Sequence, residues 1–200
     1  MHHMRRLTAA AVALATIALA LTACGSGDGS ADDAGPTTYR NDEHGFIITY
    51  SSTFEEGASR EGSGADRSPV FEIAFPAPEG ATIGDKYVDG VRVSVYTLSR
   101  KLKPAEVRKL KGAFDEVVDG MLASLGDAEV TDTLKPMELN GVPGFNLGYT
   151  YRQGEATIKS VTFFLVKDKR EFHVTGQATL EDWDELAPEL EAAIMSFTVI

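Results

Sequence analysis

The one cysteine of this chain, Cys24, carries its most nucleophilic side chain, and the segment before it has the composition of a secretory signal. Arg5 and Arg6 form a basic flank, and residues 7–23 form an uncharged run rich in alanine and leucine. A basic flank, an apolar run and a small-residue end are the plan of a signal peptide. A membrane-spanning helix usually needs about 20 apolar residues, and this run stops short of that length. We therefore predict that residues 1–23 are a signal peptide and that the protein is exported.

The residues Leu21, Thr22, Ala23 and Cys24 resemble the lipobox of bacterial lipoproteins. The resemblance implies that the Cys24 sulfur takes a diacylglycerol through a thioether and that a peptidase cleaves just before this residue. Two acyl chains hold a protein firmly on a bilayer, whereas one chain binds only marginally. The membrane is therefore an expected partner through the lipid on Cys24, and the expected location is the outer face of the cell membrane. The alternative is an ordinary signal peptide followed by a chance cysteine.

Composition and charge exclude several classes of protein. Removal of 23 residues leaves 177, which suits one domain, and a hydrophobic content of 43% supplies a core. With a single cysteine, no intramolecular disulfide can form. The expected mature chain has 17 basic and 30 acidic residues, a formal net charge of −13. Nucleic acid is not an expected partner, because binding it depends on cationic contacts to phosphate.

The expected mature chain divides into a linker and a domain. Residues 24–37 contain the lipidated cysteine and are otherwise mostly Gly, Ser, Asp, Ala and Thr, a composition that predicts a flexible linker. Residues 38–200 are expected to form the globular domain. In its first half, apolar residues alternate at period two in 46–50, 70–75 and 90–98, which predicts strands. Polar residues 41–45 favour a hairpin turn before the first strand, and the aperiodic segments 56–68 and 77–90 are predicted as surface loops.

An apolar stripe at intervals of three and four residues predicts one helix between Pro104 and Gly126. Proline suits the first turn of a helix, and glycine suits its C-cap. A basic cluster occupies the first half of this helix: Lys103, Arg108, Lys109 and Lys111. Because acidic residues lie among them, we interpret the cluster as an ordinary solvated face, with a site for an anionic ligand as the alternative.

Four further strands are predicted at 128–139, 145–151, 158–166 and 171–175. Tight turns at Asn140-Gly141, Gln153-Gly154 and Asp168-Lys169 imply that neighbouring strands pair antiparallel. Thr179 and Asp182 form a capping-box-like start for a last helix, which Pro188 is expected to kink or divide. Residues 196–200 should close the chain as an extended piece. The predicted fold class is α+β, an antiparallel β-sheet flanked by helices.

Two segments resemble PsbP-like domains. Residues 39–50, Tyr-Arg-Asn-Asp-Glu-His-Gly-Phe-Ile-Ile-Thr-Tyr, are similar to the opening hairpin of that family. The strand 172–176, Trp183 and the closing Ile194-Met195-Ser196-Phe197 are similar to its last strand, last helix and terminus. The resemblance implies an α/β/α sandwich and no inherited catalytic set. Its bacterial members include actinobacterial lipoproteins of the LpqN type, which implies a binding or assembly role.

Few residues of the domain offer a reaction centre. The sequence contains no Gly-x-Ser-x-Gly, no His-Glu-x-x-His and no phosphate-binding glycine loop, and no cofactor or metal is expected. His44 lies in the presumed turn beside two acids and is interpreted as solvated, with a loosely held metal as the alternative. His173 must face away from its neighbours Phe172 and Val174, either at the surface or under a helix. Trp183 could stack on a sugar or lipid, although a helix-stripe tryptophan more often packs in a core.

Two hypotheses of different classes remain. The first is a non-catalytic binding or assembly module of the cell envelope, whose partner is an envelope protein or an amphiphilic lipid. An apolar cavity bordered by few polar groups would favour it. The second is an envelope hydrolase or isomerase with a scattered active site. A hydrogen bond from His173 to a serine and an aspartate would favour that alternative.

Overall fold

The computed structural model describes residues 35–65, 68–84 and 86–200. The predicted signal peptide 1–23 and the motif that ends in Cys24 lie outside these residues. The described elements run in this order: β1 (Thr37–Asn41), β2 (Phe46–Tyr50), β3 (Ser59–Glu61), β4 (Phe71–Pro76), β5 (Thr82–Ile83), β6 (Lys86–Tyr87), β7 (Gly90–Leu102), α1 (Pro104–Val107), α2 (Lys111–Leu125), β8 (Glu129–Leu139), β9 (Val142–Gln153), β10 (Ala156–Thr179), α3 (Trp183–Ser196) and β11 (Thr198–Val199).

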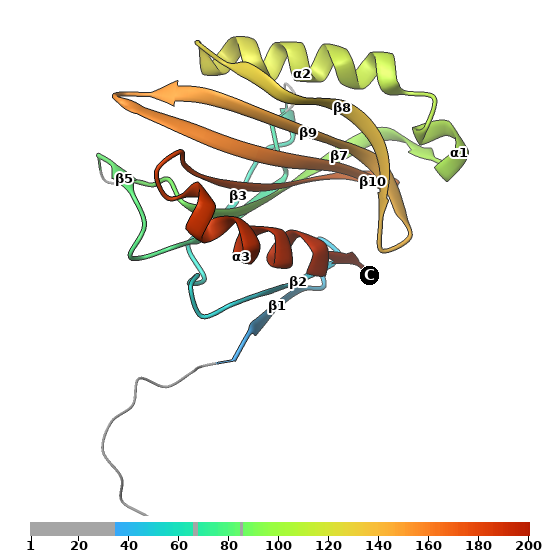
Figure 1. Ribbon diagram of the computed structural model, residues 1–200. Coiled ribbons are helices and arrows are strands. Elements are labelled where there is room, and N and C mark those ends of the chain that lie inside the picture. The colour runs from blue at the N-terminus through green and yellow to red at the C-terminus, as the bar shows by residue number, and fades with distance from the viewer. Residues whose placement is uncertain (1–34, 66–67, 85) are drawn as a thin grey trace, which may run out of the picture. The chain divides into compact units, whose positions relative to one another are not determined.

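The main sheet is antiparallel and has the order β3-β4-β7-β10-β9-β8 (Figure 1). A smaller sheet, β1-β2-β11, contains the predicted opening hairpin, in which Asn41 pairs with Phe46 across a turn that ends at Gly45. The closing residues pair with the same hairpin, because Thr198 lies opposite Ile47. The hairpin and the extended C-terminal piece are therefore both confirmed, and they lie together.

The long element β10 is folded back on itself and supplies two adjacent strands of the main sheet. The Oγ1 atoms of Thr162 and Thr175 are 2.9 Å apart, and the amide of Leu180 donates to the carbonyl of Thr157 at 2.8 Å. The residues of both pairs are equally distant from Asp168 and Lys169, so these two residues form the loop of a hairpin. Asp168 has φ 59°, a left-handed conformation found in tight turns. The predicted turn at these residues is confirmed. The first half of β10 pairs with β9, and the second half pairs with β7.

Helices cover both faces of the main sheet, so the fold is the expected α/β/α sandwich (Figure 1). On one face, α3 and the small sheet pack on alternate residues of β4, β7 and β10, including Phe75, Val93 and Phe172. On the other face, α2 lies over β8 and β9, and Phe114 and Val118 pack against Phe145 and Phe164. The alternation of side chains along each strand thus divides the hydrophobic core into two clusters.

The structure differs from the prediction at the first helix. The expected single helix 104–126 is two helices, because residues 108–110 form a tighter turn. The amides of Lys109 and Leu110 there donate to carbonyls three residues back, at 2.9 Å each. The last helix is not divided at Pro188. Proline removes the amide that would bond to Asp184, but both residues are exposed, so water can reach that carbonyl.

Two of the predicted loops contain short strands. Strand β3 lies within 56–68, and strands β5 and β6 lie within 77–90. All three residues of β3 are exposed, so this strand carries no hydrophobic alternation that a sequence pattern could reveal. No helix in the described part of the chain is long and apolar enough to cross a membrane.

Candidate functional site

The predicted lipidation motif, Leu21, Thr22, Ala23 and Cys24, lies outside the described residues, as does most of the linker 24–37. The basic cluster of the predicted helix is exposed and interleaved with acids. Arg108 pairs with Glu138 at 3.0 Å, and Lys111 pairs with Asp115 at 2.7 Å. The cluster has the geometry of a solvated helix face with neutralising partners.

The interpretation of His44 as a solvated turn residue is wrong. Its ring stacks on Phe71 with centroids 4.3 Å apart, and only 11% of its side chain is exposed. Its Nε2 atom lies 3.3 Å from Glu61 Oε1 on β3. The turn packs on the core because the ring of Phe71, at the start of β4, lies against the imidazole of His44. Among the residues with described positions, no group of three or more His, Cys, Asp and Glu could hold a metal ion.

His173 lies beneath a helix, in a cavity between α2 and strands β7 and β10. The α2 cavity has a volume of about 540 Å³, and its lining includes Tyr96, Leu98, Val117, Met121, Glu171 and His173. The His173 Nε2 atom is 2.6 Å from Glu171 Oε1, and their side chains are only 16% and 14% exposed. The Tyr96 ring lies against the imidazole, with centroids 4.3 Å apart. Residues 171 and 173 share this face because the strand alternates, with Phe172 on the other face.

The polar groups of the α2 cavity do not form a serine–histidine–aspartate arrangement. Within the described part of the chain, the side chain of His173 hydrogen-bonds to Glu171 alone. Ser94, which is opposite His173 in β7, donates its hydroxyl to Glu72 at 3.2 Å. Burial, followed by the negative charges of Glu72 and Glu171, raises the pKa of the Tyr96 hydroxyl. The tyrosine therefore remains a neutral hydrogen-bond donor.

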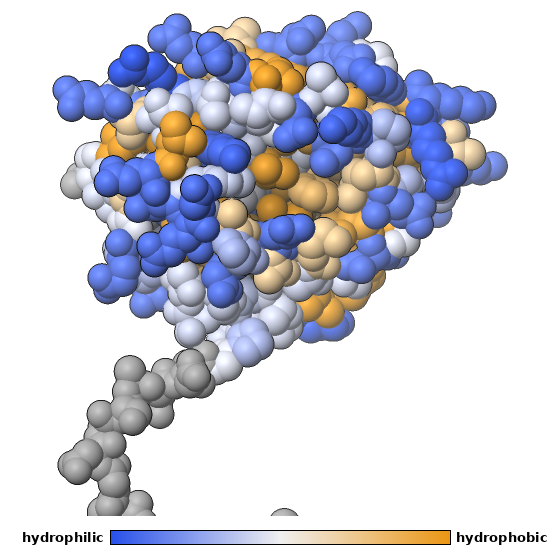
Figure 2. Space-filling view, in the orientation of Figure 1, coloured by the Kyte–Doolittle hydropathy of each residue, from blue (hydrophilic) through white to orange (hydrophobic). Residues whose placement is uncertain are grey.

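Trp183 lines a second hollow, on the opposite face of the sheet. The α3 groove has a volume of about 270 Å³, and its lining includes Val161, Phe163, Trp183, Ala187, Leu190 and Ile194. Figure 2 shows apolar side chains gathered between α3 and the strands β9 and β10. The Lys159 ammonium lies 4.5 Å from the centre of the Trp183 ring, which itself lines the groove. The tryptophan is thus only partly a core residue, and it borders an apolar surface.

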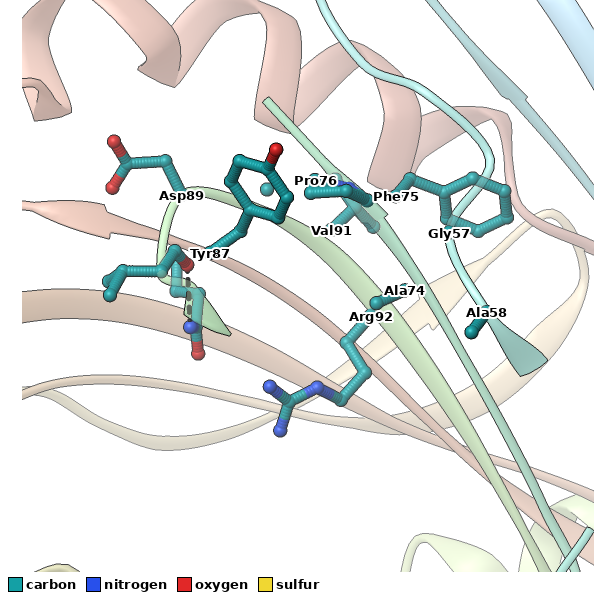
Figure 3. A pocket seen from close by; sticks show the side chains of 12 residues that line it. Gly57, Ala58, Ala74, Phe75, Pro76, Tyr87, Asp89, Val91 and Arg92 are labelled. Carbon is teal, nitrogen blue, oxygen red and sulfur yellow. Dashed lines mark hydrogen bonds between the residues drawn. The ribbon is translucent and has the colours of Figure 1, made fainter. Parts of the chain in front are cut away.

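A third hollow lies where β4 ends and β7 begins, and its buried polar groups stabilise the fold (Figure 3). The buried carboxylate of Asp89 accepts the amides of Ala81 and Thr179, each at 2.7 Å. The Gln177 side chain donates to the carbonyl of Val88 at 2.7 Å, and Arg92 extends away from Asp89. Because the polar groups nearest its floor are satisfied internally, this hollow offers a ligand apolar surface and the exposed side chain of Arg92.

Sequence reasoning singled out His173 and Trp183 but missed Tyr96, Glu171 and Lys159, which complete the two sites. A signal was present for Glu171, since a residue two positions from His173 on a strand must share its face. No comparable signal existed for Tyr96. Its place beside His173 depends on the pairing of β7 with β10, two strands separated in the chain by both helices α1 and α2.

No protein family model matches this sequence, and no curated protein sequence matches it. Solved structures do resemble the fold. The cyanobacterial PsbP protein CyanoP of Synechocystis sp. PCC 6803 superposes with a TM-score of 0.55 at 16% identity, covering 88% of this chain and 98% of its own. LpqN of Mycobacterium tuberculosis, whose structure is described as involved in cell envelope biogenesis, superposes with a TM-score of 0.50 at 15% identity, covering 82% of this chain and 90% of its own.

These similarities agree with the arrangement in Figure 1, a central antiparallel sheet with helices on both faces and a small hairpin sheet beside α3. At 15–16% identity they establish the architecture and carry no residue roles. The resemblance noted at the opening hairpin and the closing helix is confirmed at the level of structure. The chain has a PsbP-like fold.

Proposed function

We propose that the protein is an exported, lipid-anchored and non-catalytic binding module of the cell envelope, and that it holds the apolar part of an amphiphilic lipid in the α3 groove. The predicted export signal and the lipobox-like motif ending in Cys24 support the location. A PsbP-like fold shared with LpqN, a protein described as involved in cell envelope biogenesis, supports a role in the same compartment.

The observation that carries the binding role is the uncovered apolar surface beside α3. Val161 and Phe163 on β10 are only half-buried, although Leu165, the next residue on the same face of this strand, is fully buried. A soluble domain gains by covering such surface, at about 25 cal/mol for each Å² removed from water. An acyl chain along the groove would cover these side chains without any change in the sheet.

The ends of the groove favour an amphiphile over a purely apolar ligand. Lys159 is half-buried with its ammonium against the ring of Trp183, and that indole lines the groove. This combination suits a molecule with a polar head and an alkyl tail. Apart from Glu191, the groove lining has no side chain that could act as an acid or base, which supports binding without turnover.

The proposal is tested by isolating the full-length protein from its native envelope and identifying copurified lipids and proteins by mass spectrometry. Val161→Asp places a carboxylate on the groove floor, and Val130→Asp makes the same change at an exposed position on β8. We expect a reproducible lipid with the wild type and with Val130→Asp, and its loss with Val161→Asp.

Three results would contradict the proposal. A protein that copurifies in place of a lipid would assign the groove to a protein partner. Equal lipid recovery from both variants would place the lipid elsewhere on the molecule. Turnover of an envelope substrate by the purified protein would show that the module is an enzyme.

A further inference from the structure

The α2 cavity, on the face of the sheet opposite the α3 groove, is formed by the geometry of helix α2. One side of this helix packs on the sheet through Phe114 and Val118. The adjacent side, which carries Ala113, Val117 and Gly120, faces the cavity. A side chain added at Gly120 would meet nothing within 4 Å, so the small residues of this stripe leave open space above the strands.

The floor of the cavity presents a carboxylate held in place beside an aromatic ring. Glu171 is fixed by the short hydrogen bond between its Oε1 atom and His173. The hydrogen bonds that Glu171's side chain makes with described residues use this oxygen alone, which leaves Oε2 for a ligand. Tyr96 contacts the imidazole from β7 and completes the floor. The site is therefore preorganised, because neither the carboxylate nor the ring must be ordered when a ligand binds.

The acidic side chains of the cavity favour a ligand with a positive charge. Glu171 on the floor and Glu116 on the α2 wall are acidic, and none of the residues that line the cavity is Lys or Arg. Burial, followed by the negative charges of Glu72 and Glu171, raises the pKa of the Tyr96 hydroxyl, and the charge of Arg92 opposes this shift. A carboxylate beside an aromatic ring attracts an ammonium group, and the apolar walls of α2 favour an alkyl chain.

We propose that the α2 cavity binds an amphiphilic amine, with its ammonium group between Glu171 Oε2 and the Tyr96 ring and its alkyl part along Val117 and Met121. This site is independent of the α3 groove, since the two lie on opposite faces of the sheet and share no lining residue. Failure of one proposal therefore leaves the other standing.

The test compares three eight-carbon probes by isothermal titration calorimetry with the full mature chain: octylammonium, 1-octanol and octanoate, each below its micelle concentration. We expect octylammonium to bind at least about tenfold more tightly than 1-octanol, because a charge-assisted hydrogen bond adds to the same apolar contact. Octanoate should bind most weakly. Glu171→Gln should lower the octylammonium affinity by about tenfold and leave the 1-octanol affinity unchanged. Glu181→Gln, an exposed change outside the cavity, is the matched control.

If Glu171→Gln does not fold, a measurement of the His173 resonances in the wild type still tests the proposal. Imidazole resonances of His173 should shift with octylammonium and not with octanoate. Equal affinity for octylammonium and 1-octanol would overturn the proposal, because the cavity would then have no preference for a charged head. Amine binding that survives Glu171→Gln but is lost in Val161→Asp would also overturn it, by placing the probe in the α3 groove.

Discussion

The substitution Asp89→Ala tests how the fold is stabilised beside the third hollow, where β4 ends and β7 begins. The side chain is 1% exposed, and its two oxygens accept the amides of Ala81 and Thr179 at 2.7 Å each. Thr179 ends β10, and Ala81 precedes β5. One carboxylate thus ties the loop before β5 to the strand end from which α3 follows.

The expected cost follows from the two amides that lose their acceptor. An unsatisfied buried donor costs about 1–3 kcal/mol. Thr179 is buried and should show this cost in full, whereas Ala81 is half-buried and can be partly compensated by water. Removal of the carboxylate also relieves its own desolvation. We therefore expect Asp89→Ala to lower the free energy of unfolding by about 2–4 kcal/mol, and Asp89→Asn, which retains one acceptor oxygen, by about half as much.

The pH dependence gives a second, independent readout. Burial, with Asp182 nearby as a smaller cause, raises the pKa of Asp89 above its ordinary value of 3.8. A raised carboxyl pKa means that the native state binds more protons than the unfolded state, so this group loses stability as pH rises through its folded pKa. The penalty is absent in Asp89→Asn. The stability difference between wild type and Asp89→Asn should therefore shrink between pH 4 and pH 7.

Urea unfolding followed by Trp183 fluorescence and by circular dichroism measures both effects. Asp119→Ala, an exposed change on α2, serves as the control and should alter stability by less than about 0.5 kcal/mol. A loss below about 1 kcal/mol in Asp89→Ala would refute the inference that its two hydrogen bonds hold these segments together. A stability difference between wild type and Asp89→Asn that grows with pH would refute the direction of the pKa shift.

Three further predictions concern the anchor, the sheet and helix α2. Cys24→Ala should release the protein from the membrane fraction while leaving the domain folded, and a variant that stays in the membrane fraction would contradict lipidation at this thiol. Gly144→Ala should destabilise the domain by about 2 kcal/mol or more, because its new methyl group overlaps the carbonyl oxygen of Phe164 on the paired strand. Gly112→Ala on α2, with nothing within 4 Å, should instead stabilise it by about 0.5–1 kcal/mol, as urea midpoints will show.

Much of the fold is predictable because local signals and burial agree. Alternation along β2 and β4 reports which side chains face a core, and the observed burial follows it. Turns are also encoded locally. Asn140 and Gly141 both have positive φ, at 49° and 80°, and they join β8 to β9 with Leu139 opposite Val142. The helix break at 108–110 has no such signal, since its apolar stripe continues across the turn.

The candidate sites are less predictable, because each is completed by strands that are distant in the chain. His173 and Trp183 can be singled out as unusual residues, but their surroundings depend on sheet order. The register places His173 opposite Ser94, and the same pairing brings Tyr96 onto the cavity floor. His44 illustrates the same limit, since a polar turn sequence predicts solvent exposure, whereas its ring packs on Phe71.

The two sites share one physical origin, a mismatch in width between single helices and a broad sheet. A helix with its side chains is about 10 Å across, and neighbouring strands are about 4.8 Å apart, so one helix covers roughly two strands. Helix α2 lies over β8 and β9 and leaves β7 open, whereas α3 lies over β10 and leaves an apolar strip toward β9. The strip under α2 is acidic and aromatic, and the strip beside α3 is apolar with a lysine at one end. Because the two strips differ in charge and polarity although they share this origin, the two proposals assign them different ligands.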